Sequence, residues 1–149
     1  MAAGKTNVTI IEDDSIYVKV LGEKLGQNPA VFISQYASGE DCIANLATDQ
    51  PKVLITDYYL NSKNANAING SEVVKRIKET YPDLAVIVLS GRADLSTASK
   101  TSELNDSLES NPGNVKKLLS EGAFFYVMKD KNAPAKIYDI VDLLIRKVF

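Results

Sequence analysis

The stretch VTIIEDDSIY at residues 8–17 places four β-branched residues directly before three consecutive acidic residues. A short run of this kind predicts a buried strand. The residues that follow place Tyr17, Leu21 and Leu25 on one helical face, which predicts a helix. The same unit of strand, polar end and helix recurs along the chain, and this alternation is typical of an α/β fold.

Five such apolar runs are present, and helical patterns separate them. Three of them, including 53–56 and 85–89, are almost wholly apolar, as expected for parallel strands that helices cover on both faces. Ser38 is the predicted N-cap of the second helix, and Pro134 is expected in the first turn of the last. The sequence therefore predicts a doubly wound, five-stranded parallel sheet. The predicted strands are 8–11, 31–33, 53–56, 85–89 and 124–128, and the predicted helices are 17–25, 38–46, 71–81, 115–121 and 134–148.

The composition restricts the class of protein. The 149 residues, 45% apolar and 24% charged, suit one compact domain with a buried core. The 17 basic and 19 acidic residues give a net charge of −2, which is not typical of a nucleic-acid binder. No apolar run approaches the roughly 18 residues of a membrane span, and no secretory signal precedes the first strand. The single cysteine, Cys42, fits a reducing compartment. We therefore expect one cytoplasmic domain over residues 1–149 that contacts neither nucleic acid nor membrane directly.

The chain contains no histidine. This excludes a histidine-based catalytic triad, a histidine-ligated zinc or haem site, and a phosphohistidine intermediate on this chain. One cysteine cannot form a thiolate metal site either. Any chemistry must therefore use carboxylates, hydroxyls, lysine and backbone groups, which suit Mg²⁺ and phosphate.

Charged and hydroxyl groups follow four of the five predicted strands. Each alone is ordinary, since an acidic residue after a strand is usually a turn former or an N-cap, and a single serine or lysine usually belongs to a loop or the surface. The carboxyl ends of parallel strands, however, meet at one edge of the sheet, where α/β proteins bind ligands. We therefore expect these groups to form one site. They are the carboxylates of Glu12, Asp13, Asp14 and Asp57, the Ser90 hydroxyl and the Lys129 amine.

The chemistry of this set points to phosphoryl transfer. Clustered carboxylates raise one another's pKa unless a cation neutralises them. Hard oxygen ligands without histidine or cysteine select Mg²⁺. A carboxylate beside such an ion can attack phosphorus and form an aspartyl phosphate. An amine and a hydroxyl supply the positive charge and the hydrogen bond that the transferred oxygens need.

Four segments resemble a known family: VTIIEDDSIY (8–17), VLITDYYL (53–60), AVIVLSGRAD (85–94) and GAFFYVMKD (122–130). In this order and at this spacing they resemble the response-regulator receiver domain of two-component signalling, over residues 6–148. The resemblance implies a flavodoxin-like (βα)5 fold with strand order 2-1-3-4-5. It also implies Mg²⁺ as cofactor and a histidine kinase or histidine phosphotransfer protein as phosphoryl donor.

The resemblance assigns the acidic residues separate roles. Asp57 is the implied phosphoacceptor and one of the metal ligands. Glu12 and Asp13 are the implied acidic pair for Mg²⁺, with Asp13 the expected direct ligand, and the backbone carbonyl of Tyr59 is implied as a further ligand. Asp14 lies one position beyond the pair, where the family does not require an acid.

The same resemblance assigns the remaining site residues. Ser90 is the implied hydroxyl that turns toward the phosphoryl group, and Lys129 pairs with the phosphoryl oxygens. Tyr126 is the aromatic residue whose inward or outward rotamer is expected to follow the switch. Tyr59 and Arg92 flank the site and are expected to tune water access and hence the lifetime of the phosphoryl group, with a bulky Tyr59 slowing autodephosphorylation.

The sequence departs from the family pattern in three places. Lys129 is usually followed by a proline with a cis bond, but Asp130 follows here, so we expect a trans bond. Polar residues enlarge the loop after the third strand, at about 61–69. A longer polar insertion follows the fourth strand at about 96–114, and its expected content is a displaced or interrupted fourth helix with an extra loop.

These observations favour a phosphorylation-controlled switch that signals by binding an unidentified protein partner. We expect self-phosphorylation from a donor and slow autodephosphorylation, with no turnover of a separate substrate. Two alternatives remain. One is a receiver-like interaction module that no longer switches by phosphorylation. The other is a phosphatase with an aspartate nucleophile, although such enzymes resemble Asp-x-Asp after the first strand, whereas Asp57 follows the third and precedes two tyrosines.

Overall fold

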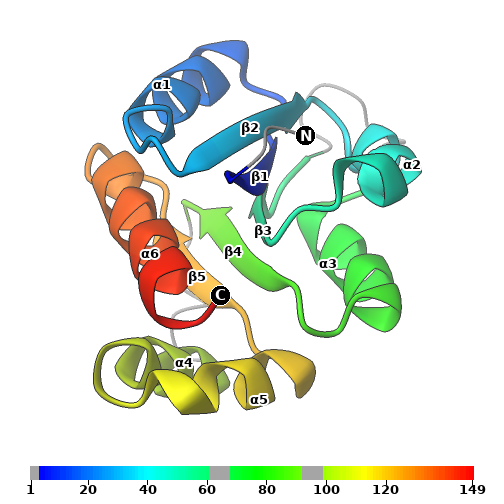
Figure 1. Ribbon diagram of the computed structural model, residues 1–149. Helices are drawn as coiled ribbons and strands as arrows, with labels where there is room; N and C mark the ends of the chain where they lie inside the picture. Colours follow the sequence, from blue (N-terminus) through cyan, green and yellow to red (C-terminus); the bar gives the residue numbers. More distant parts are fainter. Residues whose placement is uncertain (1–3, 61–67, 92–98) are drawn as a thin grey trace.

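The computed structural model describes residues 4–60, 68–91 and 99–149. The strands within these ranges form a parallel sheet of five in the order β2-β1-β3-β4-β5, with helices on both faces (Figure 1), as predicted. The strands are β1 (Thr6–Ile11), β2 (Val31–Tyr36), β3 (Val53–Asp57), β4 (Ala85–Ser90) and β5 (Phe125–Met128). The helices are α1 (Ser15–Leu25), α2 (Gly39–Asp49), α3 (Gly70–Thr80), α4 (Ser99–Ser110), α5 (Val115–Ser120) and α6 (Ala133–Lys147), with a 3-10 turn, Pro112–Asn114, before α5.

Two apolar cores lie on opposite faces of the sheet. Side chains alternate across a strand, so Ile87 of β4 belongs to one core and Val88 to the other. Helices α1 and α6 pack together over the first core, and α2 and α3 cover the second. All residues of β3 and β4 are buried, as expected for central strands of a doubly wound sheet.

The helix starts follow the local chemistry that the sequence predicts. The Ser38 side chain accepts a hydrogen bond from the backbone N–H of Asp41 and caps α2. Pro134 lies in the first turn of α6, where its missing N–H has no helical partner to lose. These local signals fix where α2 and α6 begin, shortly after the carboxyl ends of β2 and β5.

The insertion after β4 contains a helix. The fourth helix is interrupted as expected, since residues 99–110 form the 12-residue helix α4, which is separate from α5. Leu104 and Leu108 are buried in the first core, and the Thr101 hydroxyl donates to the Phe124 carbonyl at 3.0 Å. A helix that buries only two leucines gives a weak apolar pattern, which is why its sequence reads as polar. The other predicted insertion, 61–69, lies mostly outside the described residues.

No helix in the described ranges combines the length and the apolar character needed to cross a bilayer.

Candidate functional site

Three carboxylates meet at the carboxyl edge of the sheet. Strands β1 and β3 are neighbours with Ile11 opposite Thr56, so Glu12 and Asp57 follow at the same level. One carboxylate oxygen from each of Glu12, Asp13 and Asp57 lies within 4.8 Å of the others. Glu12 and Asp57 are buried and Asp13 is half-buried. The structure therefore brings together the three acidic side chains that the sequence predicted for a metal site.

Lys129 binds two of these carboxylates. It directly follows β5, and its ammonium lies 2.9 Å from Glu12 Oε2 and 3.0 Å from Asp57 Oδ2. Its backbone N–H donates to the Ser90 carbonyl at 2.9 Å, which extends the pairing of β5 with β4. Burial alone would lower the pKa of the Lys129 amine, but the hydrogen bonds and charges of Glu12 and Asp57 raise it above its usual value. Lys129 is therefore a fixed positive charge at the cluster.

Burial destabilises the ionised form of Glu12. Burial raises its pKa from 4.5 to about 7, with a further upward contribution from the charge of Asp57. The hydrogen bond from Lys129 and the backbone N–H of Asp14 oppose this shift. One ammonium thus does not fully compensate a carboxylate that is removed from water.

This pKa predicts a pH-dependent stability of the metal-free protein. A carboxyl whose pKa is higher in the folded than in the unfolded state takes up a proton on folding. The stability linked to Glu12 is therefore fully present below pH 4.5, declines as the pH rises, and is lost above about pH 7. As the pH is raised from 5 to 8 in EDTA, we expect the free energy of unfolding of Glu12→Gln to rise by about 2 to 3 kcal/mol relative to that of the wild type. Urea unfolding measures this difference. A difference that does not change with pH would contradict this.

The cluster has the donor set of a magnesium site. Mg²⁺ takes hard oxygen ligands, with one or two carboxylates supplied by the protein. Glu12, Asp13 and Asp57 offer such oxygens, and a divalent cation would supply the charge that Lys129 alone does not. The residues therefore fit Mg²⁺, with the backbone carbonyl of Tyr59 as a predicted further ligand.

Ser90 and Tyr126 lie on the neighbouring strands. Ser90 ends β4 one position beyond Leu89, which pairs with Asp57, and it is fully buried. The Tyr126 hydroxyl lies 3.4 Å from the Ser90 carbonyl oxygen and 3.7 Å from Met128 Sδ. The phenol of Tyr126 thus reaches the strand end that carries Ser90. Their roles in switching stay predictions.

Two aspartates beside the site have structural roles. Asp14, whose role the sequence left open, is the N-cap of α1, and its Oδ1 accepts from the N–H groups of Ile16 and Tyr17. Asp130, which stands where the family has proline, accepts from the Asn132 N–H at 2.8 Å and shapes the turn into α6. The described residues contain no cis peptide bond, so the bond after Lys129 is trans as expected.

Sequence reasoning missed two residues of the site. The ring of Tyr17 lies under the Lys129 ammonium, 4.7 Å from ring centroid to Nζ. Gly70 begins α3 with its N–H bonded to the Tyr58 carbonyl, and a Cβ at this position would lie 2.2 Å from the Asp57 carbonyl oxygen. The helical spacing of Tyr17 suggested only core packing, and no local signal distinguishes Gly70 from a loop glycine.

Of the two residues predicted to tune lifetime, one can be placed. Tyr59 is half-buried, its N–H donates to Asp57 Oδ1 at 3.4 Å, and its ring packs edge-on against Tyr58. Arg92 lies outside the described residues.

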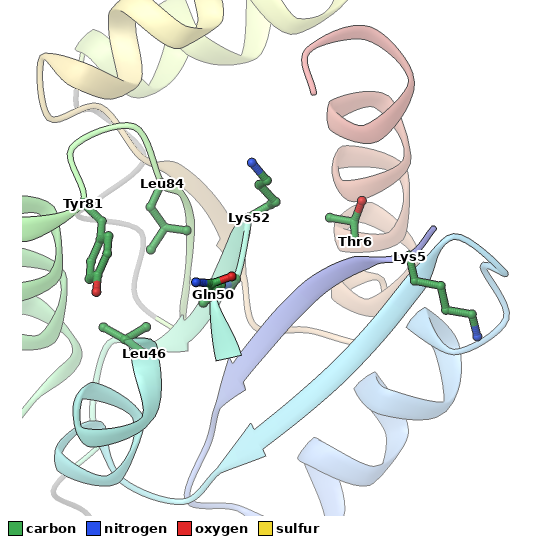
Figure 2. A pocket seen from close by; sticks show the side chains of 8 residues that line it. Lys5, Thr6, Leu46, Gln50, Lys52, Tyr81 and Leu84 are labelled. Atoms are coloured by element: carbon green, nitrogen blue, oxygen red, sulfur yellow. The ribbon is translucent and has the colours of Figure 1, made fainter. Parts of the chain in front are cut away.

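A separate hollow lies at the opposite edge of the sheet (Figure 2). It has a volume of about 450 Å³, and its wall includes Leu46, Gln50, Tyr81 and Leu84. Thr6 and Lys52, which also line it, stand at the amino-terminal ends of β1 and β3. The candidate site is therefore a charged strand edge, and it shares no residue with this hollow.

Comparison with known proteins identifies the family. The model of the response regulator receiver domain matches residues 8–107, and the chain belongs to this family. Receiver domains are the phosphorylation switches of two-component systems and take their phosphoryl group from histidine kinases. The family thus accounts for an acidic cluster at the carboxyl edge of this sheet.

The chain is similar to a known regulator over part of its length and to solved receiver-domain structures over nearly all of it. A stretch of 94 residues is 31% identical to the DNA-binding transcriptional regulator NtrC of Proteus hauseri, and covers 63% of this chain but only 19% of that protein. A CheY-like receiver domain protein of Methanospirillum hungatei JF-1 is 17% identical with a TM-score of 0.67, over 96% of both chains. The isolated REC domain of RcsB from Salmonella enterica serovar Typhimurium, with phosphomimetic BeF3−, is 23% identical with a TM-score of 0.66, over 95% of this chain and 89% of that one. The two structural matches bear on the fold alone.

Proposed function

We propose that this chain is a signalling switch that accepts a phosphoryl group on Asp57 with Mg²⁺ as cofactor, and that it signals by binding a protein partner. The observation that carries the proposal is the ammonium of Lys129, which pairs with both Glu12 and Asp57 beside a cluster of three carboxylates. This arrangement provides a nucleophile, metal-ligand oxygens and a positive charge in one place. We further propose that residues 1–149 act as one receiver unit in the cytoplasm.

Each residue of the site has a separate role in the proposed phosphoryl transfer. A carboxylate oxygen of Asp57 attacks the phosphorus of the donor, so that an O–P bond forms while the bond from phosphorus to the leaving group breaks. In a phosphohistidine donor the imidazole nitrogen keeps that electron pair. Lys129 neutralises charge on the transferred oxygens, and Ser90 donates a hydrogen bond to them. Mg²⁺, when bound by Glu12, Asp13 and Asp57, supplies further charge neutralisation.

None of these 149 residues is a histidine that could carry the phosphoryl group, so we propose that a histidine kinase or a histidine phosphotransfer protein is the donor. Helix α1 offers a surface for such a partner beside the site. Ile16 and Val20, one turn apart on this helix, leave 75% and 48% of their area in water. A histidine kinase or phosphotransfer protein that covers them would bring its phosphohistidine to the edge where Asp57 lies.

After transfer, the new dianion shifts the population of two conformations, to the extent that it binds one better than the other. We propose that Ser90 and Tyr126 respond to it, since their strand ends adjoin Asp57 and the Tyr126 hydroxyl already reaches the Ser90 carbonyl. Tyr59 and Arg92 are proposed to limit water access and thereby the rate of autodephosphorylation.

Incubation with Mg²⁺ and acetyl phosphate tests the proposal directly. We expect intact-mass spectrometry to show one added phosphoryl group on the wild type and none on Asp57→Ala, because the side chain of Glu12, which also pairs with Lys129, is 0% exposed, whereas that of Asp57 is 9% exposed. Asp139→Ala, at an exposed position of α6, is the matched control and should react like the wild type. An unmodified wild type, or an adduct that persists in Asp57→Ala, would falsify the proposal.

Beryllofluoride distinguishes a switch from a receiver-like module that no longer switches. In a switch, amide chemical shifts change on binding both at Asp57 and along β5 to Tyr126. In a module without switching, the changes stay within the carboxylate cluster. The replacement of the expected proline by Asp130 favours a module that does not switch. The chemical-shift comparison decides between the switch and this module.

A further inference from the structure

The Lys129 ammonium has an aromatic contact besides its two ion pairs. Its Nζ lies over the ring of Tyr17, 4.7 Å from the centroid, while Glu12 and Asp57 bind it at 2.9 and 3.0 Å. A cation at this distance from a ring face is attracted by the negative charge of the π system, and the attraction strengthens where water is excluded. Side chains from α1, from the end of β3 and from the residue after β1 thus surround one ammonium.

The position of Tyr17 is itself firmly held. It lies in the first turn of α1, and its backbone N–H is bound by Oδ1 of the N-cap Asp14 at 3.2 Å. Its ring packs against the first core. The Tyr17 hydroxyl is buried and has no hydrogen-bond partner among the described residues. The geometry therefore offers the ring, and not the hydroxyl, as the part of Tyr17 that acts on the site.

Ion pairs alone leave a lysine loosely oriented. The ammonium is a compact charge on a flexible four-carbon stem, so it can meet two carboxylates from many directions. A ring on the third side removes part of this freedom and keeps water away from that side. The ammonium is then held in advance where the transferred phosphoryl oxygens arrive, and this pre-organisation increases the rate of transfer.

We infer that Tyr17 is a positioning residue for phosphoryl transfer, which holds the Lys129 ammonium at the carboxylate cluster through the face of its ring. The inference rests on the proposed function of Asp57 and Lys129. It predicts that the aromatic ring is required at position 17 and that the hydroxyl is dispensable.

Three variants test the inference with acetyl phosphate and Mg²⁺. We expect Tyr17→Leu to slow phosphorylation of Asp57 about three- to tenfold at saturating donor, and Tyr17→Phe to stay within about twofold of the wild type. Tyr138→Leu is the matched control, since Lys24 lies over the Tyr138 ring at 5.2 Å in the same kind of pair on α1 and α6. It should leave the rate unchanged.

A spectroscopic measurement separates positioning from activity. Protons above an aromatic ring resonate upfield, so the ε-protons of Lys129 should be shifted upfield in the wild type and in Tyr17→Phe. In Tyr17→Leu, or in Tyr17→Met if the leucine variant does not fold, they should return toward ordinary lysine values.

Each outcome has one meaning. Ordinary ε-proton shifts in the wild type, a Tyr17→Leu rate equal to that of the wild type, or a Tyr17→Phe rate as low as that of Tyr17→Leu would overturn the inference. If the wild type itself takes no phosphoryl group, the proposed function fails, and the ε-proton shifts still report whether Tyr17 holds Lys129.

Discussion

Replacing Lys129 with methionine is expected to destabilise the metal-free protein by about 3 to 5 kcal/mol and to slow phosphorylation of Asp57 by at least about a hundredfold. The methionine keeps most of the volume of the stem but removes the charge. It leaves the carboxylates of Glu12 and Asp57, whose side chains are 0% and 9% exposed, without their shared cation. Removing one partner of a buried ion pair is costly because the remaining charge stays out of water.

The pH dependence of this loss identifies its cause. At pH 5 Glu12 is protonated, since its pKa is about 7, and only part of the negative charge is left uncompensated. At pH 8 Glu12 of the variant either stays ionised without its paired cation or takes up a proton from solution. Both cost free energy. Urea unfolding in EDTA should therefore show a larger destabilisation at pH 8 than at pH 5.

Two further variants serve as controls for Lys129. Lys131→Met, at an exposed lysine two residues along, should change neither stability nor rate. The double variant Glu12→Gln with Lys129→Met should recover much of the stability, because one buried charge is removed, while its phosphorylation stays slow. If Lys129→Met were as stable as the wild type at pH 8, the folded protein would not need the charge of Lys129 to keep the carboxylates of Glu12 and Asp57 buried.

Gly70→Ala is expected to destabilise the protein by about 3 kcal/mol and to reduce phosphorylation by about a hundredfold. An added Cβ would lie 2.2 Å from the Asp57 carbonyl oxygen and 2.9 Å from Tyr58 Cα. Both are backbone atoms of the segment that carries the phosphoacceptor, so no side chain can move aside. Helix α3 would have to shift away from β3, or the backbone at Asp57 would have to move.

Comparison with another glycine isolates this steric effect. Gly113→Ala has only one neighbouring atom within 4 Å, at 3.8 Å, and neither glycine requires a positive φ. We expect its stability to stay within about 0.5 kcal/mol of the wild type. Thermal unfolding and the acetyl phosphate reaction measure both variants, and equal behaviour of the two would show that the close approach at Gly70 can relax.

Local sequence patterns were sufficient to predict the strands and the charged groups that meet at their carboxyl ends. The run at 8–11 and the acids at 12–14 predict a strand and its end, and the same holds for Asp57 after 53–56. Side-chain periodicity and turn chemistry act over a few residues, so they can be read along the chain. Because parallel strands end at a common edge, the strand ends alone predicted that Glu12, Asp57 and Lys129 would meet.

Helix α4 is an element that local patterns alone do not specify. Its sequence is mostly polar, and it is anchored by Leu104, Leu108 and the bond from Thr101 to Phe124. The hydrogen bond joins residues 23 positions apart, and the two leucines lie in a core that also includes residues of β1 and α6. The stability of this helix therefore comes from tertiary packing and not from its own pattern.

The geometry of the site likewise depends on distant contacts. Lys129 pairs with Glu12 across 117 positions of sequence and with Asp57 across 72. Which carboxylates share the ammonium, that Tyr17 lies beneath it, and that Gly70 must lack a side chain all follow from interatomic distances between separate elements. Sequence periodicity specifies the face on which a residue lies, but only the packing of α1, α3 and β5 around the strand ends sets these distances.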